Sequence, residues 1–360
     1  DITLSSLLVR MRSFVIGFTL GLLAVIAFFG WRLSKRMKER LVRPIDEITA
    51  AAQQYMDDRI QGIASNHFSH LDIKTGDEIE KLSMTMADME QALADYEANL
   101  TIITAETEKI ATELSLAEKI QAAALPKKFP AFPDRHEFDI YAAMDPAREV
   151  GGDFYDYFLI DDDHLALTIS DVSGKGIPAS LFMMSSKIKI ADYYMLGKSP
   201  AEVLEAANDA ICQTDHEEMF VTVWTGILEI STGRIVACNA GHEYPYLRQP
   251  DGNFEIVKDK HGFVIGGMEG MKYTEYEFTM KPGTTLFVYT DGAPEATDQN
   301  NELFGMDRLT AALNKDPDAS CQQILVNVRK DIDEFVGEAE QFDDLTMLCV
   351  KYFGPDQKQS

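Results

Sequence analysis

Acidic side chains that could perform chemistry recur where predicted apolar strands meet turns. They are Asp153, Asp171, Asp291 and Asp343, with Asp344 beside the last. If these strands are neighbours, their carboxylates converge at one end of a sheet. Crowded Asp oxygens repel one another unless hard cations neutralise them, and oxygen ligands with retained water suit Mg²⁺ or Mn²⁺. Two such ions about 3.5–4 Å apart would lower the pKa of a bridging water and clamp a phosphoryl group. The pattern therefore predicts a two-metal centre for phosphoryl chemistry.

Each motif also has an ordinary structural interpretation when it is considered alone. An Asp-Gly pair at a strand end is commonly a turn former. Lys175 lies between two glycines, but the phosphate-loop pattern G-x-x-x-x-G-K-[ST] is not present in the sequence. Gly151-Gly-Asp-Phe154 is similar to the G-G-D-E-F signature of diguanylate cyclases, yet Phe154 replaces its Glu. His242, beside a Gly turn, is more typical of a hydrogen-bonded corner than of a catalytic group.

The aspartates lie within a region of short strands and paired helices that begins after prolines 126, 130 and 133. Segments rich in Val, Ile, Thr and aromatic residues are predicted as strands: 138–143, 165–170, 220–230, 234–239, 285–290 and 345–352. Helical patterns cover 178–195, 200–214, 306–315 and 320–336. Adjacent strands with inserted helix pairs predict a layered α+β fold.

Residues 13–31 form an uncharged stretch of 19 residues dominated by Phe, Leu, Ile, Val, Ala and Gly. At about 1.5 Å per residue, it can cross a hydrocarbon core of about 30 Å. A buried core helix or a signal-peptide core is the alternative, but the stretch ends in Phe-Phe-Gly-Trp and a basic run. Six Lys/Arg in the next dozen residues, against two before the stretch, predict a cytoplasmic C-terminal side. We predict a transmembrane helix over 13–31, in contact with the lipid bilayer, and expect 1–12 to end an extracytoplasmic region missing from this chain.

Two amphipathic helices are predicted after the basic run. The first has Pro44 in its first turn and apolar residues at alternating steps of four and three, namely Leu41, Ile45, Ile48, Ala52 and Tyr55. After a looser stretch, 57–76, a longer repeat begins at Ile79. Its apolar seam occupies positions 79, 82, 86, 89, 93, 96, 100, 103, 110, 114 and 117, and only Thr107 interrupts it. More than five heptads without Gly or Pro predict a parallel homodimeric coiled coil.

The order of helix, connector and helix directly after a membrane segment resembles a HAMP domain, which would form a four-helix bundle in the dimer. We predict this domain over 32–86 and a coiled-coil signalling helix over 87–120. A plain helical stalk is the alternative. Either arrangement can transmit a piston, rotation or register change to the region after Pro126.

Five ordered motifs, taken together, resemble the bacterial sporulation-stage-II-E class of PPM protein phosphatases, which are related to type 2C. The motifs are Ala147–Asp156, Asp171–Ala179, Asn239–His242, Thr290–Gly292 and Asp343–Thr346. The resemblance covers about 121–353 and leaves 354–360 as a tail. It implies a β-sandwich flanked by helix pairs and hydrolysis of phosphoserine or phosphothreonine without a phosphoenzyme.

By motif position, the resemblance implies metal ligands at Asp153, Asp171, the carbonyl of Val172, Asp291 and Asp343, holding two Mn²⁺ or Mg²⁺ ions. Asp344 falls where animal relatives carry Asn, so its ligation is left open. Arg148 matches the phosphate-binding Arg of the wider family, and a guanidinium fits a phosphate dianion; it could also pair with a surface carboxylate. The implied substrate is a phosphorylated STAS-type anti-sigma-factor antagonist, and the implied location is a bacterial cytoplasmic (inner) membrane.

Composition limits the other function classes. The chain has 33 Lys+Arg against 59 Asp+Glu, a formal net charge of −26, so binding to nucleic acid is disfavoured. A non-catalytic receptor with a phosphatase-like partner-binding domain is the main alternative, but it would be expected to have lost at least one of the four aspartates. A histidine-kinase-type receptor is disfavoured because segment 79–117 contains no His.

Overall fold

The structure, a computed structural model, describes residues 2–214 and 219–355. The chain divides into two compact units, Asp1–Lys109 and Ile110–Ser360. Residue 1 of the predicted segment 1–12 and residues 356–360 of the predicted tail lie outside the described residues.

The N-terminal unit begins with α1 (Ile2–Met37), which continues through a π-helical turn (Lys38–Val42) into α2 (Arg43–Ile60). By length and composition, the helical stretch Leu7–Ile60 can cross a membrane. Its apolar side chains are exposed, with Phe14 at 75% and Phe29 at 63%. This stretch includes the predicted segment 13–31.

A small apolar core joins α2, the connector that follows it and the beginning of α3 (Glu78–Ala124). Ile48 and Ala51 of α2 pack with Phe68 and Ile73 of the connector. The carboxylate of Glu90, on α3, is buried and accepts backbone N–H groups of connector residues 67, 68 and 69 at 2.7, 3.0 and 3.2 Å. The stretch predicted as loose is therefore fixed by side chains of both helices.

Helix α3 runs for 47 residues without interruption, because it contains no Gly or Pro that would weaken or break the backbone hydrogen bonds. Most of the predicted seam is exposed on the single chain: Leu82, Met89, Leu93, Tyr96, Leu100, Ile103 and Ile110. An apolar stripe of this length is the surface that a helix presents to another helix.

The C-terminal unit is a sandwich of two five-stranded antiparallel sheets. The first sheet has the order β1 (Phe138–Asp145), β10 (Leu345–Tyr352), β9 (Thr285–Tyr289), β6 (Tyr246–Arg248) and β7 (Phe254–Ile256). The second has the order β2 (Phe154–Leu159), β3 (His164–Val172), β4 (Val221–Glu229), β5 (Arg234–Ala240) and β8 (Glu275–Thr279). Inward residues of both sheets, including Ile140, Leu167, Leu286 and Val350, form one buried core.

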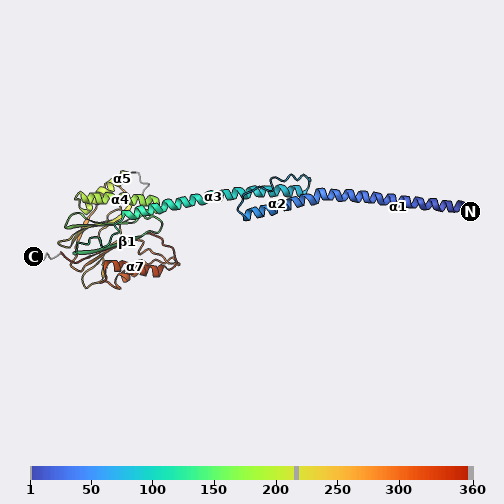
Figure 1. The fold of residues 1–360 in the computed structure, drawn as a ribbon. Coiled ribbons are helices and arrows are strands. Elements are labelled where there is room, and N and C mark those ends of the chain that lie inside the picture. The colour runs from blue at the N-terminus through green and yellow to red at the C-terminus, as the bar shows by residue number, and fades with distance from the viewer. Residues whose placement is uncertain (1, 215–218, 356–360) are drawn as a thin grey trace. The chain divides into compact units, whose positions relative to one another are not determined.

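Two helix pairs cover the outer faces of the sandwich (Figure 1). Helices α4 (Ile177–Met195) and α5 (Pro200–Cys212) pack on the second sheet through buried residues such as Met183 and Leu204. Helices α6 (Gly305–Leu313) and α7 (Cys321–Val336) pack on the first sheet through Leu309, Leu325 and Val328. The predicted α+β layered fold with flanking helix pairs is confirmed.

Candidate metal centre

Strand register brings Asp153 and Asp171 together. Asp153 directly precedes β2, and Asp171 is the penultimate residue of β3. Because Phe154 pairs with Ser170 in this antiparallel sheet, the positions next to them are also opposite one another. The carboxyl groups of Asp153 and Asp171 are close enough for each to affect the pKa of the other.

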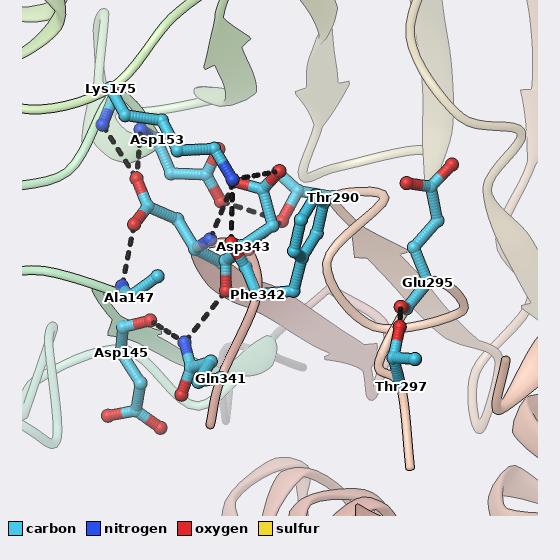
Figure 2. A network of polar contacts seen from close by, with 12 residues as sticks. Asp145, Ala147, Asp153, Lys175, Thr290, Glu295, Thr297, Gln341, Phe342 and Asp343 are labelled. Carbon is cyan, nitrogen blue, oxygen red and sulfur yellow. Dashed lines mark hydrogen bonds and ion pairs between the residues drawn. The ribbon is translucent and has the colours of Figure 1, made fainter. Parts of the chain in front are cut away.

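The other sheet contributes Asp291 and the Asp343-Asp344 pair. Strand β9 ends just before Thr290, whose backbone N–H donates to the carbonyl of Thr346 at 3.0 Å. This bond extends the β9–β10 pairing and places Asp291 beside the residues that precede β10. The side chain of Thr290 donates to the carboxyl of Asp153 at 2.7 Å, so it joins the two sheets at the site (Figure 2).

Asp344 holds the loop before β2 through backbone groups. Its carboxylate accepts N–H groups from Ala147 at 2.8 Å, Gly152 at 2.6 Å and Asp153 at 3.3 Å. The carboxylate lies so close that a Cβ at Gly151 would be 2.3 Å from its Oδ2. In this structure Asp344 is thus a loop-fixing residue, which explains why an acidic side chain suits the position.

Two further glycines allow the strand ends to approach. A Cβ at Gly152 would be 2.9 Å from the carbonyl oxygen of Val172, and one at Gly292 would be 1.9 Å from the carbonyl oxygen of Asp344. Larger residues would push apart the neighbouring strand ends within each sheet, β2 from β3 and β9 from β10. The Asp-Gly pair at 291–292 therefore has a packing role in addition to its turn.

Asp343 pairs with Lys175, from the loop between β3 and α4. The ammonium lies 3.0 Å from the carboxylate of Asp343, donates to the carbonyl of Phe342 at 2.6 Å and lies 4.2 Å from the centre of the Phe342 ring (Figure 2). Lys175 therefore supplies a positive charge beside Asp343, on the partly exposed side of the acidic cluster.

Burial and mutual repulsion disfavour charge on these carboxyl groups. Burial, followed by the charges of Asp291 and Asp343, raises the pKa of Asp171 to about 8. Burial, followed by the charges of Asp343 and Glu295, raises the pKa of Asp291 to about 6. Burial and the charges of Asp171 and Asp344 raise the pKa of Asp153 well above its ordinary value. A divalent cation among these oxygens would offset the repulsion, so the donor set suits a hard metal ion.

Within residues 2–214 and 219–355, no three Asp, Glu, His or Cys side chains are arranged as a ready-made ligand group. The geometry gives a reason: Asp343 is paired with Lys175, and Asp344 is engaged by backbone N–H groups.

The remaining predicted residues lie around this cluster. Val172 is buried at the end of β3, and Arg148 is exposed on the loop between β1 and β2. His242 is buried, and its ring contacts the hydroxyl of Thr222 at 2.8 Å. Burial lowers the pKa of His242 to about 3, as expected of a neutral corner residue.

Sequence reasoning missed three residues at the site. Thr290 stood within a quoted motif but was given no role, and Lys175 was considered only for a phosphate loop. Gln121, near the end of α3, hydrogen-bonds the backbone of Gly151 in both directions. No local pattern indicates such contacts, because the partners are distant in sequence.

Sequence relatives match between 51% and 68% of this chain. Protein IcfG of Synechocystis sp. is 32% identical over 266 residues, which are 66% of this chain and 41% of that protein. Phosphoserine phosphatase RsbU of Bacillus subtilis is 26% identical over 245 residues, 68% of this chain and 71% of RsbU. Phosphoserine phosphatase RsbP of the same organism is 30% identical over 189 residues, 51% of this chain and 46% of RsbP. The chain thus spans less than half the length of IcfG and of RsbP.

Solved phosphatase structures share the fold. The SiaA-PP2C domain of Pseudomonas aeruginosa superposes with a TM-score of 0.61 at 22% identity, covering 69% of this chain and 98% of that domain. The PP2C domain of SpoIIE from Bacillus subtilis, with part of its regulatory domain, gives a TM-score of 0.52 at 17% identity, covering 60% of this chain and 63% of that one. The C-terminal unit therefore has the PP2C-type fold.

The family described as Stage II sporulation protein E (SpoIIE) matches residues 161–353. This range includes Asp171, Asp291 and Asp343, and it begins after Asp153. Because the match covers more than half of the chain and agrees with the fold and the acidic cluster, the chain belongs to the SpoIIE family.

Proposed function

We propose that this chain is a membrane-anchored, metal-dependent protein serine/threonine phosphatase, a phosphoric monoester hydrolase. The observation that carries the proposal is the acidic cluster at one end of the sandwich. The pKa values of Asp153, Asp171 and Asp291 are all raised there, first by burial and then by the charges of neighbouring carboxylates. The names of the relatives RsbU and RsbP, both phosphoserine phosphatases, support this reaction.

Two Mn²⁺ or Mg²⁺ ions would be held by the carboxylates of Asp153, Asp171, Asp291 and Asp343 and by the carbonyl of Val172. When bound, these ions supply an acidified water and neutralise the phosphate charge. Residues of the chain do the rest: Thr290 orients the carboxyl of Asp153 by its 2.7 Å hydrogen bond, and Asp344 fixes the loop that carries Asp153.

Arg148 would bind the substrate phosphate. Its loop runs from β1 to β2 and ends at Asp153, and the side chain is exposed. A guanidinium can bind two phosphate oxygens at once. An exposed Arg on the loop that carries a metal ligand can reach a phosphoprotein without prior movement of the core.

The N-terminal unit would anchor and regulate the enzyme. The stretch Leu7–Ile60 can cross a membrane by length and composition, and the basic run after 13–31 favours a cytoplasmic phosphatase unit. The core between α2, the connector and α3 supports a HAMP domain over 32–86. The exposed seam of α3 supports a parallel homodimer through the HAMP domain and the coiled coil 87–120. The phosphatase domain would occupy 121–353.

The substrate would be a cytoplasmic regulatory protein phosphorylated on Ser or Thr, of the STAS type by family resemblance. A non-catalytic receptor that only binds such a partner is the competing function. The retained aspartates favour the enzyme, because binding alone does not require crowded buried carboxyl groups, which are costly to keep.

The test is hydrolysis of p-nitrophenyl phosphate and of a phosphoserine-containing STAS protein by the full chain in detergent micelles. We expect turnover with Mn²⁺, none with excess chelator, and recovery when Mn²⁺ is restored. Asp171→Asn, with its unfolding transition measured in parallel, is the inactive control. A folded wild-type chain that binds the phosphorylated protein without turnover at any Mn²⁺ concentration would establish the non-catalytic receptor instead.

A further inference from the structure

Gln121 makes a paired contact with the acidic site from the last turn of α3. Its side-chain Nε2 donates to the carbonyl of Gly151 at 2.6 Å, and its Oε1 accepts the N–H of Gly151 at 3.1 Å. The side chain is only 5% exposed, whereas the preceding Ile120 is 53% exposed. A buried primary amide that satisfies both backbone groups of one residue fixes that residue in position and orientation.

The contact adjoins a proposed metal ligand. Gly151 lies two residues before Asp153. A Cβ at Gly151 would overlap the carboxylate of Asp344, so this position requires glycine. The segment 151–153 is therefore held from two directions. Gln121 binds both backbone groups of Gly151, while Asp344 binds the N–H groups of Gly152 and Asp153. Asp344 precedes a central strand, whereas Gln121 belongs to the long helix.

The end of α3 is attached to the sandwich by other contacts as well. Leu125 is part of the main core, and the hydroxyl of Tyr155 donates to the carbonyl of Pro126 at 2.8 Å. These contacts attach the chain where the helix ends, so the Gln121 amide is not needed to hold the helix. Its hydrogen bonds are directed to the loop instead.

We infer that Gln121 is a positioning residue that couples the last turn of α3 to the Asp153 loop and thereby sets the metal affinity of the site. This inference rests on the proposed metal-dependent function. A displacement of the helix end acts on Gly151 first, and the backbone passes it to Asp153 two residues later. The helix thus adjusts a ligand without contacting the ion.

The test uses the full chain in detergent micelles and two binding readouts. Mn²⁺ affinity is measured from the electron paramagnetic resonance signal of free Mn²⁺, and protection of segment 150–153 is measured by hydrogen–deuterium exchange in excess chelator. In Gln121→Met we expect about tenfold weaker Mn²⁺ binding, equivalent to about 1.4 kcal/mol, and faster exchange of the Gly151 amide. The kcat at saturating Mn²⁺ should return to near the wild-type value, because no reacting group has changed.

Lys119→Met is the matched control, since Lys119 is exposed on the same turn of helix and receives the same new side chain. Gln121→Asn keeps the amide but shortens its reach, so it should also bind Mn²⁺ more weakly. This variant replaces Gln121→Met in the test if the Met variant does not fold. Wild-type Mn²⁺ affinity in a folded Gln121→Met or Gln121→Asn variant would overturn the inference. If the wild-type chain itself binds no Mn²⁺ and has no phosphatase activity, the proposed function fails, and the inference fails as a consequence. Equal Mn²⁺ affinities in variant and wild type would overturn the inference alone.

Discussion

Replacing Thr290 by valine would remove the hydroxyl that joins the two sheets at the acidic cluster. That hydroxyl is fully buried, donates to the carboxyl of Asp153 at 2.7 Å and accepts the N–H of Thr346 at 3.1 Å. Valine has nearly the same shape, so little cavity is created. The change therefore isolates the two hydrogen bonds from packing.

The expected cost follows from the groups that lose their partner. A buried polar group left unpaired costs about 1–3 kcal/mol, and here one carboxyl and one backbone N–H are affected. We expect Thr290→Val to lower the free energy of unfolding by about 2–6 kcal/mol. At about 2–4 °C per kcal/mol for a unit of this size, the melting temperature of the phosphatase unit should fall by about 4–24 °C.

Urea unfolding followed by tryptophan fluorescence can measure this loss. The chain has two tryptophans: Trp224 is fully buried in the sandwich, and Trp31 is exposed on α1. In a Trp31→Phe background, the signal reports the sandwich alone. The midpoint should fall while the slope with urea stays constant.

Thr285→Val is the matched control. The hydroxyl of Thr285 is also buried and has no hydrogen-bond partner in the described part of the chain. Its removal should leave stability unchanged or raise it, because an unsatisfied buried hydroxyl is lost. Equal losses in the two valine variants, or a wild-type midpoint for Thr290→Val, would refute the reasoning.

Three further outcomes are expected. Asp171→Asn and Asp291→Asn should each lower kcat by orders of magnitude at saturating Mn²⁺, while the urea midpoint does not fall, since each replaces a carboxyl group whose charged form is disfavoured by burial and by neighbouring carboxylates; wild-type turnover in either folded variant would contradict the two-metal assignment. Gly292→Ala should destabilise the phosphatase unit by about 3 kcal/mol or more in the same unfolding assay, because its Cβ would lie 1.9 Å from a backbone oxygen. Insertion of one to seven residues near Ala98 should make the phosphatase rate oscillate with the heptad period if helix phase regulates the site, whereas a flat profile would reduce α3 to a tether.

The main strands and all four flanking helices of the phosphatase unit could be predicted, because their apolar patterns are long and bounded by turns. Helix α4 was predicted over 178–195 and is Ile177–Met195; β10 was predicted over 345–352 and is Leu345–Tyr352. Strand β2 was not predicted, because Phe154–Leu159 directly follows the Gly-Gly-Asp motif and is largely buried on both faces, so it does not alternate. The three-residue strands β6 and β7 are too short for any period to show.

Strand β8 was also not predicted, but for a different reason. Glu275–Thr279 reads Glu-Tyr-Glu-Phe-Thr, a clear two-residue alternation that could have identified it. It is an edge strand of the second sheet, which agrees with its two charged residues on one side. The signal for this strand is therefore local and present in the sequence.

The convergence of the aspartates could be predicted because strand ends and turns are local features, but their partners could not. Asp344 contacts residues almost 200 positions earlier, and Lys175 reaches Asp343 across the fold. By motif position, the family resemblance implies a metal ligand at Asp343 and leaves the ligation of Asp344 open. The packed sandwich separates their contacts: the carboxylate of Asp344 accepts three N–H groups of the loop before β2, whereas that of Asp343 accepts the N–H of Asp344 and pairs with an ammonium.

These contacts separate a buried carboxylate from a partly exposed one, since Asp344 is 9% exposed and the side chain of Asp343 is 27% exposed. The charge of Asp344 is stabilised by fixed N–H groups of 147, 152 and 153, which cannot be exchanged without moving the loop. The carboxylate of Asp343 accepts the backbone N–H of Asp344 at 2.9 Å and pairs with the ammonium of Lys175 at 3.0 Å. The contacts of Asp344 shape the loop that carries Asp153, whereas those of Asp343 involve its own neighbour and the loop that carries Lys175. The carboxylate that meets backbone N–H groups of the loop and the carboxylate that meets an ammonium thus lie next to each other in the chain, and the first of them sets the geometry of the segment that carries Asp153.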